Sequence, residues 1–81
     1  MIIKVLGPGC GNCKRLESNV AAALAESGVD ATVEKVTDYA EIAGYGIAST
    51  PGLVIDDTVV MSGRVATVAE IFALLDATSQ A

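Results

Sequence analysis

The hydrophobic pattern of the chain alternates between short apolar runs and stretches with helical spacing, and this alternation constrains the fold most. The segments that begin at Cys10, Asp38 and Thr67 have apolar residues at helical spacing. Short apolar, β-branched runs occupy residues 1–6, 31–36, 53–55 and 58–61. Because strands and helices have different periods, the pattern predicts the order β-α-β-α-β-β-α. With 81 residues, the chain is expected to form one domain, residues 1–81.

The connections between these elements predict how the strands pair. A strand–helix–strand unit crosses over in the right-handed sense, so the first two strands are expected to be parallel. Asp56 and Asp57 form a short turn that predicts an antiparallel hairpin for the last two strands. The fold class is therefore α/β, with a four-stranded mixed sheet and helices on both faces. We expect Met61 and Phe72 to lie in the core.

Three helix boundaries carry recognisable capping signals. Asp38 with Glu41, and Thr67 with Glu70, have the spacing of a capping box, which marks a helix start. Gly28 follows the first long helical stretch and suits the positive φ that often ends a helix.

Composition excludes several classes of function. Ten acidic residues against five basic ones give a net charge of -5, which argues against nucleic acid or an anionic membrane as partner. The sequence has no His, and two cysteines are too few for a closed zinc site. The charge-free stretch 42–55 is too short and too interrupted by Gly and Pro to span a membrane. Without a signal-peptide pattern, a soluble cytoplasmic protein is expected.

The chemistry of the chain is concentrated in Cys10-Gly11-Asn12-Cys13, at the junction between the first strand and the first helix. The N-terminus of a helix stabilises an anion, so Cys10 is expected to be the thiolate nucleophile. Cys13 lies one turn further on, on the apolar face, and is expected to be the resolving thiol. Lys14 adds positive charge nearby and is expected to tune the pKa of Cys10 modestly.

Other interpretations of the two cysteines stay open from the residues alone. A C-x-x-C between a strand and a helix also occurs in copper chaperone domains that bind Cu(I) or another soft metal, although their order is β-α-β-β-α-β. A non-catalytic redox sensor would also form a reversible disulfide. Thr50-Pro51 marks the entry to a strand, and an ordinary trans proline is its more common interpretation.

Taken together, several segments resemble the thioredoxin superfamily, in the short, glutaredoxin-sized form of small prokaryotic "redox-active disulfide" proteins. The matching segments are residues 3–14 (IKVLGPGCGNCK), 16–17, 33–37 (VEKVT), 49–56 (STPGLVID) and 62–65. The resemblance implies that Pro51 is cis and faces the disulfide, and that Thr50 offers backbone groups to an extended substrate. Gly9, Gly11 and Asn12 are then expected to border the substrate.

The resemblance also implies an activity and its partners. It predicts a protein-disulfide reductase without a cofactor, which acts in electron transport and cell redox homeostasis. Disulfide-containing proteins would be its substrates, a thioredoxin-reductase-like enzyme or glutathione its electron donor, and a monomer its state. The chain departs from typical thioredoxins in having Gly9 in place of Trp and Gly11-Asn12 in place of Gly-Pro. It also has no acidic residue before Cys10 to match their buried acid.

Overall fold

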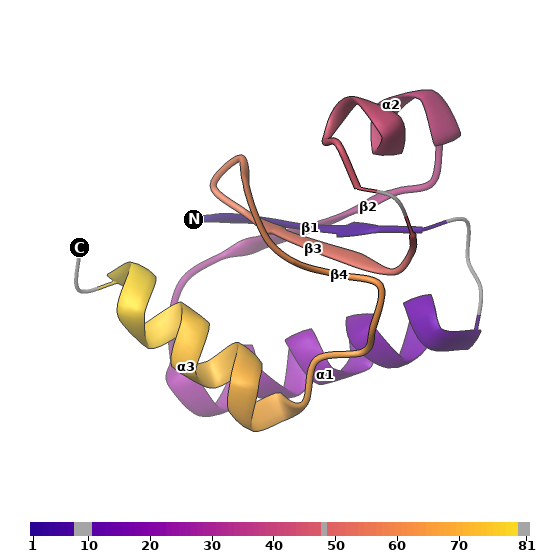
Figure 1. The fold of residues 1–81 in the computed structure, drawn as a ribbon. Coiled ribbons are helices and arrows are strands. Elements are labelled where there is room, and N and C mark those ends of the chain that lie inside the picture. Colours follow the sequence, from indigo (N-terminus) through magenta and orange to yellow (C-terminus); the bar gives the residue numbers. More distant parts are fainter. Residues whose placement is uncertain (8–10, 48, 80–81) are drawn as a thin grey trace.

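The computed structural model describes residues 1–7, 11–47 and 49–79. Seven elements follow one another in the expected order (Figure 1). They are β1 (Ile2–Leu6), α1 (Gly11–Ser27), β2 (Thr32–Val36), α2 (Tyr39–Gly44), β3 (Gly52–Ile55), β4 (Thr58–Ser62) and α3 (Val68–Ser79). The order predicted from the hydrophobic pattern is therefore confirmed.

The four strands form one mixed sheet in the order β2-β1-β3-β4. β1 pairs in parallel with β2 and antiparallel with β3, and β3 and β4 form the antiparallel hairpin. Both predicted pairings are confirmed. Because β1 and β3 lie in the middle of the sheet, their residues are almost all buried, whereas Thr32 to Lys35 on the edge strand β2 are exposed.

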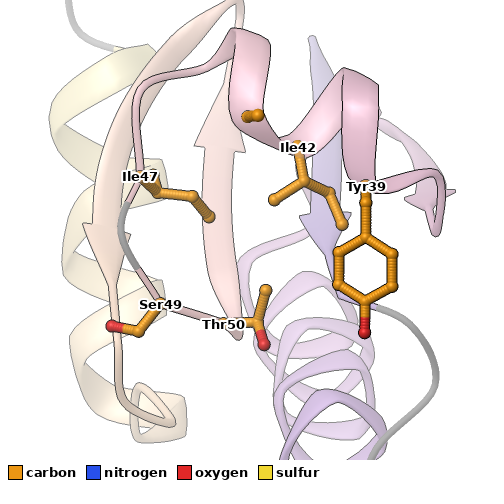
Figure 2. Close-up of a pocket in the computed structure, with 6 residues that line it drawn as sticks. Tyr39, Ile42, Ile47, Ser49 and Thr50 are labelled. Atoms are coloured by element: carbon orange, nitrogen blue, oxygen red, sulfur yellow. The ribbon is translucent and has the colours of Figure 1, made fainter.

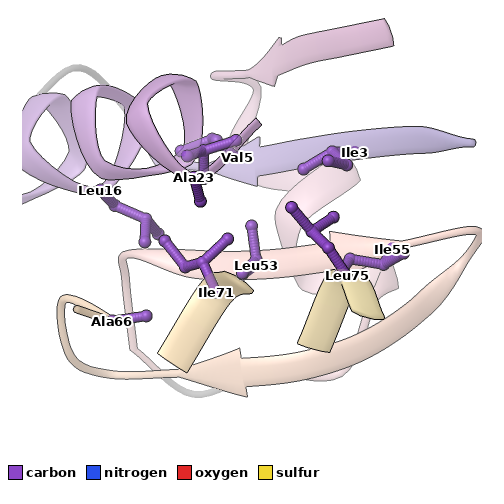
Figure 3. Packing of buried hydrophobic residues seen from close by; sticks show 10 residues of the cluster. Ile3, Val5, Leu16, Ala23, Leu53, Ile55, Ala66, Ile71 and Leu75 are labelled. Carbon is purple, nitrogen blue, oxygen red and sulfur yellow. The ribbon is translucent and has the colours of Figure 1, made fainter. Parts of the chain in front are cut away.

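Helices cover both faces of the sheet, as expected (Figure 1). α1 and α3 lie side by side against one face, and the larger core forms between them and the sheet (Figure 3). Its buried members are Ile3, Val5, Leu16, Val20, Ala23, Leu53, Ile55, Ala66, Ile71 and Leu75. Burying a Leu, Ile or Val side chain contributes roughly 1.5–3 kcal/mol, so this cluster is the main source of stability.

The short helix α2 covers the opposite face and forms a smaller core of Leu6, Val36, Ile42 and Val54. Asp38 caps this helix, since its carboxylate accepts a hydrogen bond from the backbone N–H of Ala40. The cap fixes where α2 begins, and Ile42 of this helix belongs to one cluster with Leu6 and Val36, the last residues of β1 and β2.

Lys4 lies in the middle of the central strand β1 and yet has a polar partner. Its Nζ donates a hydrogen bond of 2.9 Å to the Tyr45 hydroxyl and lies 5.6 Å from the centre of the Tyr45 ring. The Asp57 carboxylate lies 3.8 Å from the same Nζ. The hydrogen bond to Tyr45 is the main cause that raises the pKa of Lys4. A lysine in a central strand is thus accommodated because its charged end reaches the surface.

A two-residue turn joins β3 and β4 without any glycine. Asp56 and Asp57 both have positive φ, 48° and 65°, the backbone of a type I′ hairpin turn. Asp56 also binds the start of β1, because its Oδ1 accepts a hydrogen bond from the N–H of Ile2. Its own N–H donates to the Ile2 carbonyl. These contacts hold the turn against the central strand.

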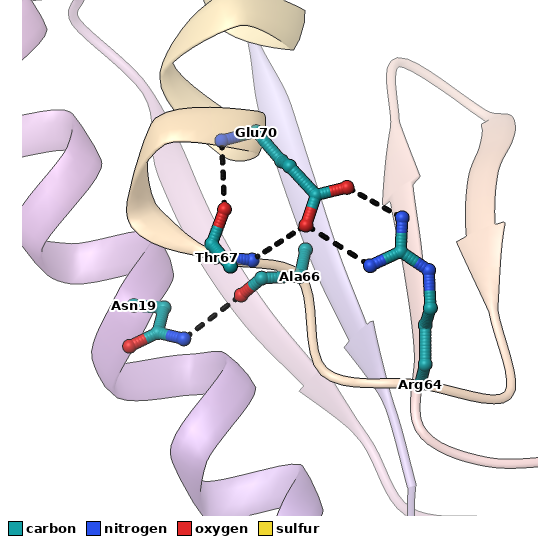
Figure 4. A network of polar contacts seen from close by, with 5 residues as sticks. All are labelled: Asn19, Arg64, Ala66, Thr67 and Glu70. Carbon is teal, nitrogen blue, oxygen red and sulfur yellow. Dashed lines mark hydrogen bonds and ion pairs between the residues drawn. The ribbon is translucent and has the colours of Figure 1, made fainter.

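The predicted capping box opens α3 (Figure 4). The Glu70 N–H donates to the Thr67 hydroxyl, and the Thr67 N–H donates to the Glu70 carboxylate. Arg64 donates two hydrogen bonds to the same carboxylate. From α1, the Asn19 amide donates to the carbonyl of Ala66. The network ties the start of α3 both to the loop after β4 and to α1.

One core prediction is wrong. Phe72 is 39% exposed, because it lies one residue beyond the inward-facing Ile71 and is therefore rotated away from the sheet. Met61 packs, partly buried, against the larger core, as expected. Among the described residues, no helix is long and apolar enough to cross a membrane.

Candidate active site

Cys13 lies in the first turn of α1, where the helix begins at Gly11. Its side chain is 4% exposed and is disulfide-bonded. Cys10, the other cysteine of the sequence, and Gly9 lie outside the described residues. The predicted position of Cys13, inside the first turn and on the apolar face, is therefore what the structure has.

The first turn of α1 carries positive charge and no acid. Gly11, Asn12 and Lys14 are all exposed there, and no acidic residue lies in this turn. Its free N–H groups and the helix dipole favour an anion at this end of the helix. Three of the residues predicted to lie near the disulfide are thus accessible from solvent beside Cys13.

Gly7, at the end of β1, connects Cys13 with the loop before β3. A Cβ on Gly7 would overlap Sγ of Cys13 and lie 3.1 Å from its Cβ and 3.9 Å from Cβ of Thr50. Only a residue without a side chain leaves room for the sulfur at this position. Nothing near Gly7 in the sequence indicates this contact, because the contact depends on how the end of β1 and the first turn of α1 lie in space.

The loop before β3 presents Thr50 on this side of the molecule. The Thr50–Pro51 peptide bond is cis, the isomer that the resemblance implied, and Pro51 is fully buried. The Pro51 carbonyl accepts a hydrogen bond of 2.9 Å from the N–H of Gly63, just after β4. Gly63 has φ +80°, and a Cβ there would lie 2.9 Å from Oγ of Ser49. Gly63, the residue after β4, thus fixes the loop before β3 through this hydrogen bond.

A hollow of about 380 Å³ opens between α2 and this loop (Figure 2). We call it the α2 pocket, and its lining residues are Tyr39, Ile42, Ala43, Ile47, Ser49 and Thr50. Most of this lining is apolar, and the Tyr39 side chain stands at its edge with 70% of its surface exposed. The pocket can take an apolar side chain next to the backbone of Thr50.

A second, smaller hollow of about 60 Å³ reaches Cys13 from the side of β2. We call it the Cys13 pocket, and it is lined by Val5, Gly7, Cys13, Lys14, Glu17, Lys35 and Thr37. Glu17 and Lys35 form an ion pair across it, with 3.3 Å between Oε1 and Nζ. Glu17 follows Cys13 by four positions and so lies on the same side of the helix, which is the one signal in the sequence that could have pointed to it. Lys35 has no such local signal, because it lies on β2.

The described residues contain no group of three or more His, Cys, Asp or Glu side chains that could hold a metal ion. What they bring together is a buried, oxidised Cys13, the backbone of Gly7 and the loop of Thr50. This arrangement suits chemistry at sulfur.

Comparisons with known proteins agree with this geometry. The family model described as "Thioredoxin domain" matches residues 1–76. A thioredoxin of Methanothermobacter thermautotrophicus is 40% identical over 75 residues, which cover 93% of this chain and 97% of the relative. A thioredoxin of Methanocaldococcus jannaschii is 41% identical over 71 residues, which cover 88% of this chain and 81% of the relative. The chain belongs to the thioredoxin family, and its general function is of the thiol–disulfide oxidoreductase type.

Proposed function

We propose that this chain reduces disulfides in other proteins, with Cys10 as the nucleophile and Cys13 as the resolving thiol. The observation that carries the proposal is the placement of Cys13, which is disulfide-bonded, buried in the first turn of α1 and next to Gly7. A buried thiol at that place is protected from outside disulfides and reacts with its neighbour in the sequence motif.

The first step is the attack of the Cys10 thiolate on one sulfur of a substrate disulfide. A mixed disulfide forms between Cys10 and the substrate, and the other substrate sulfur leaves with the electron pair and takes a proton from water. The start of α1 favours the thiolate, because its free N–H groups and dipole attract negative charge. Lys14, exposed in the same turn, adds positive charge in solvent.

In the second step, Cys13 loses its proton and attacks Sγ of Cys10. The bond between Cys10 and the substrate breaks, the second substrate sulfur leaves as a thiolate, and the Cys10–Cys13 disulfide remains. A thiol donor, which we propose to be a thioredoxin-reductase-like enzyme or two molecules of glutathione, then returns two electrons to the chain and is itself oxidised to a disulfide. We place the cycle in a reducing cytoplasm, with the chain acting as a monomer.

The α2 pocket supports a protein substrate over a small disulfide. An extended segment that pairs with the backbone of Thr50 would place its next side chain over the pocket, against Tyr39 and Ile47. Because most of the lining is apolar, segments with an apolar residue beside the cysteine are favoured. Gly11 and Asn12, both exposed, border the path of the same segment.

The proposal is tested by reduction of insulin disulfides with dithiothreitol as the electron source. The wild-type chain is expected to speed precipitation of the insulin B chain, and Cys10→Ser to abolish the effect. Cys13→Ser is expected to accumulate a mixed disulfide that appears as a mass adduct. Ser18→Ala, an exposed residue on the same helix, is the matched control and should act as wild type.

Equal residual activity in the two cysteine variants would contradict the assigned roles. A Cu(I) titration separates the main alternative, because tight one-to-one binding without insulin reduction identifies a metal-binding module. A reversible disulfide without turnover identifies a redox sensor. Either result replaces the proposed function.

A further inference from the structure

In the resolving step the Cys13 thiol must lose its proton, and its burial in the fold makes that loss difficult. Cys13 is 4% exposed, so bulk water barely reaches its sulfur. A thiol attacks a disulfide only as the thiolate, and its proton must therefore leave before the bond forms. On the side of β1, Gly7 lies directly against the sulfur and carries no group that could accept the proton.

The Cys13 pocket offers the route. It extends from Cys13 to the surface between α1 and β2, and its volume of about 60 Å³ is room for one or two water molecules. Val5 of β1 and Gly7 just after it carry no titratable group, and Thr37 supplies only a hydroxyl. The only carboxylate among its described lining residues is that of Glu17.

Glu17 is held in position by a neighbouring strand. It lies one turn after Cys13 on α1, where side chains four residues apart come within about 5–6 Å at Cβ. The Nζ of Lys35 on β2 lies 3.3 Å from its Oε1. The Glu17 side chain is 37% exposed, and that of Lys35 is 64% exposed. The carboxylate thus touches both the pocket and bulk water, as a group that passes on protons must.

We propose that Glu17 is the group that takes the proton from Cys13 in the resolving step, through water in the Cys13 pocket. The Sγ–H bond of Cys13 breaks, its proton passes to the Glu17 carboxylate, and the electron pair stays on sulfur. The thiolate then forms the bond to Sγ of Cys10 and expels the partner thiolate. Glu17 afterwards releases the proton to solvent. No net oxidation occurs beyond that of the two cysteines.

The charges around Glu17 define its working state. Lys14 on α1 and Lys35 on β2 are the other charged groups among the described residues that line the pocket. When Glu17 takes up a proton, its ion pair with Lys35 is weakened, which drives the proton onward to water. Lys35 is therefore a positioning residue that keeps the carboxylate facing the pocket.

This inference rests on the proposed function, but its test separates the two. The reduced chain is mixed with excess dithiobis(nitrobenzoate) in a stopped-flow spectrometer. The first coloured anion is released by Cys10, at a rate that depends on reagent concentration. The second is released when Cys13 attacks the mixed disulfide, at a rate that does not depend on reagent concentration. No protein substrate is involved, so a chain that fails to reduce insulin disproves the proposed function alone.

Glu17→Gln is expected to slow the second release about tenfold or more near neutral pH and to leave the first unchanged. The rate of the second release should then rise with hydroxide concentration over the whole neutral range, because water must take the proton. Glu17→Asp keeps a carboxylate and should recover part of the rate. Glu26→Gln makes the same change of charge at an exposed position further along α1 and should behave as wild type.

Lys35→Met tests whether the ion pair alone matters, since it removes the pair and keeps the carboxylate. We expect it to slow the second release less than Glu17→Gln does and to keep the pH profile of the wild type. The proposal is overturned if Glu17→Gln and Glu26→Gln give the same second rate. It is also overturned if Lys35→Met and Glu17→Gln slow that rate equally.

Discussion

Gly7 lies directly against the sulfur of Cys13, so closely that a Cβ at Gly7 would overlap Sγ. Both residues are buried; Gly7 directly follows β1 and Cys13 lies in α1, on the two sides of the segment 8–10. The contact fixes how near the first turn of α1 lies to the end of the central strand. The Cys13 sulfur can therefore occupy its position only because residue 7 is a glycine and has no side chain.

Gly7→Ala is expected to destabilise the fold by about 1–3 kcal/mol, because an added methyl group in a tightly packed site forces its neighbours to move. The measurement is the free energy of unfolding of the oxidised chain in a denaturant titration. Gly44→Ala is the matched control, since a Cβ there meets nothing within 4 Å and Ala is favoured in a helix. Equal stability of the two variants would mean that Gly7 does not limit the packing around Cys13.

The sequence predicted the elements of this fold because each depends on local information. The helical spacing of Leu16 and Val20, or the pairing of Thr67 with Glu70, is readable within a few residues. The role of Gly7 was not readable, because it depends on where Cys13 and Thr50 lie in space. Glu17 was missed for the same reason, since its partner Lys35 is eighteen positions away on another strand.

The cis bond before Pro51 shows a different limit. Nothing in the residues around Thr50 distinguishes this proline from an ordinary trans one, which is the common form. Only the resemblance to a family pointed to the cis isomer that the structure has. Phe72 shows a third limit, because a shift of one residue along α3 turns an apolar side chain from the core to the surface.

Asp57→Gly is expected to stabilise the hairpin by up to about 1 kcal/mol, because Asp57 has φ 65°, a conformation that glycine adopts without steric cost. Asp57 is exposed, and its ion pair with Lys4 at 3.8 Å contributes little. The thermal midpoint of unfolding is the measurement.

Asp56→Gly is the contrasting variant at the neighbouring position. It also relieves a positive φ, but it removes the carboxylate that accepts the Ile2 N–H. It should therefore gain less stability than Asp57→Gly or lose some. If both variants shift the midpoint equally, the hydrogen bond to Ile2 contributes nothing measurable.

The start of α3 is expected to lose stability in acid. The two hydrogen bonds from Arg64, and then the N–H of Thr67, lower the pKa of Glu70 from 4.5 to about 2. Since the folded state has the lower pKa, the stabilisation is complete above the unfolded value and is lost as pH falls toward 2. In denaturant titrations, the free energy of unfolding should be higher for wild type than for Glu70→Gln near neutral pH. The two values should converge in that acidic range.

Glu26→Gln is the control for this titration, because it removes an exposed acid on α1 that lies outside the network at the start of α3. The free energy of unfolding of Glu26→Gln, relative to wild type, should change less with pH than that of Glu70→Gln. A constant difference between wild type and Glu70→Gln across the acidic range would show that the network does not depend on the charge of Glu70.

Tyr39 is the aromatic residue that lines the α2 pocket. Its ring is 70% exposed at the edge of the pocket, so Tyr39→Ala should leave the free energy of unfolding nearly unchanged. If a protein substrate covers this ring, the variant should raise KM for insulin several-fold, since burying an aromatic ring contributes on the order of 1 kcal/mol or more. Its rate with dithiobis(nitrobenzoate), a small reagent that has no polypeptide segment to cover the Tyr39 ring, should stay that of the wild type. Phe72→Ala, an exposed aromatic residue on the opposite face of the sheet, is the control. An equal rise of KM in both variants would place the substrate elsewhere.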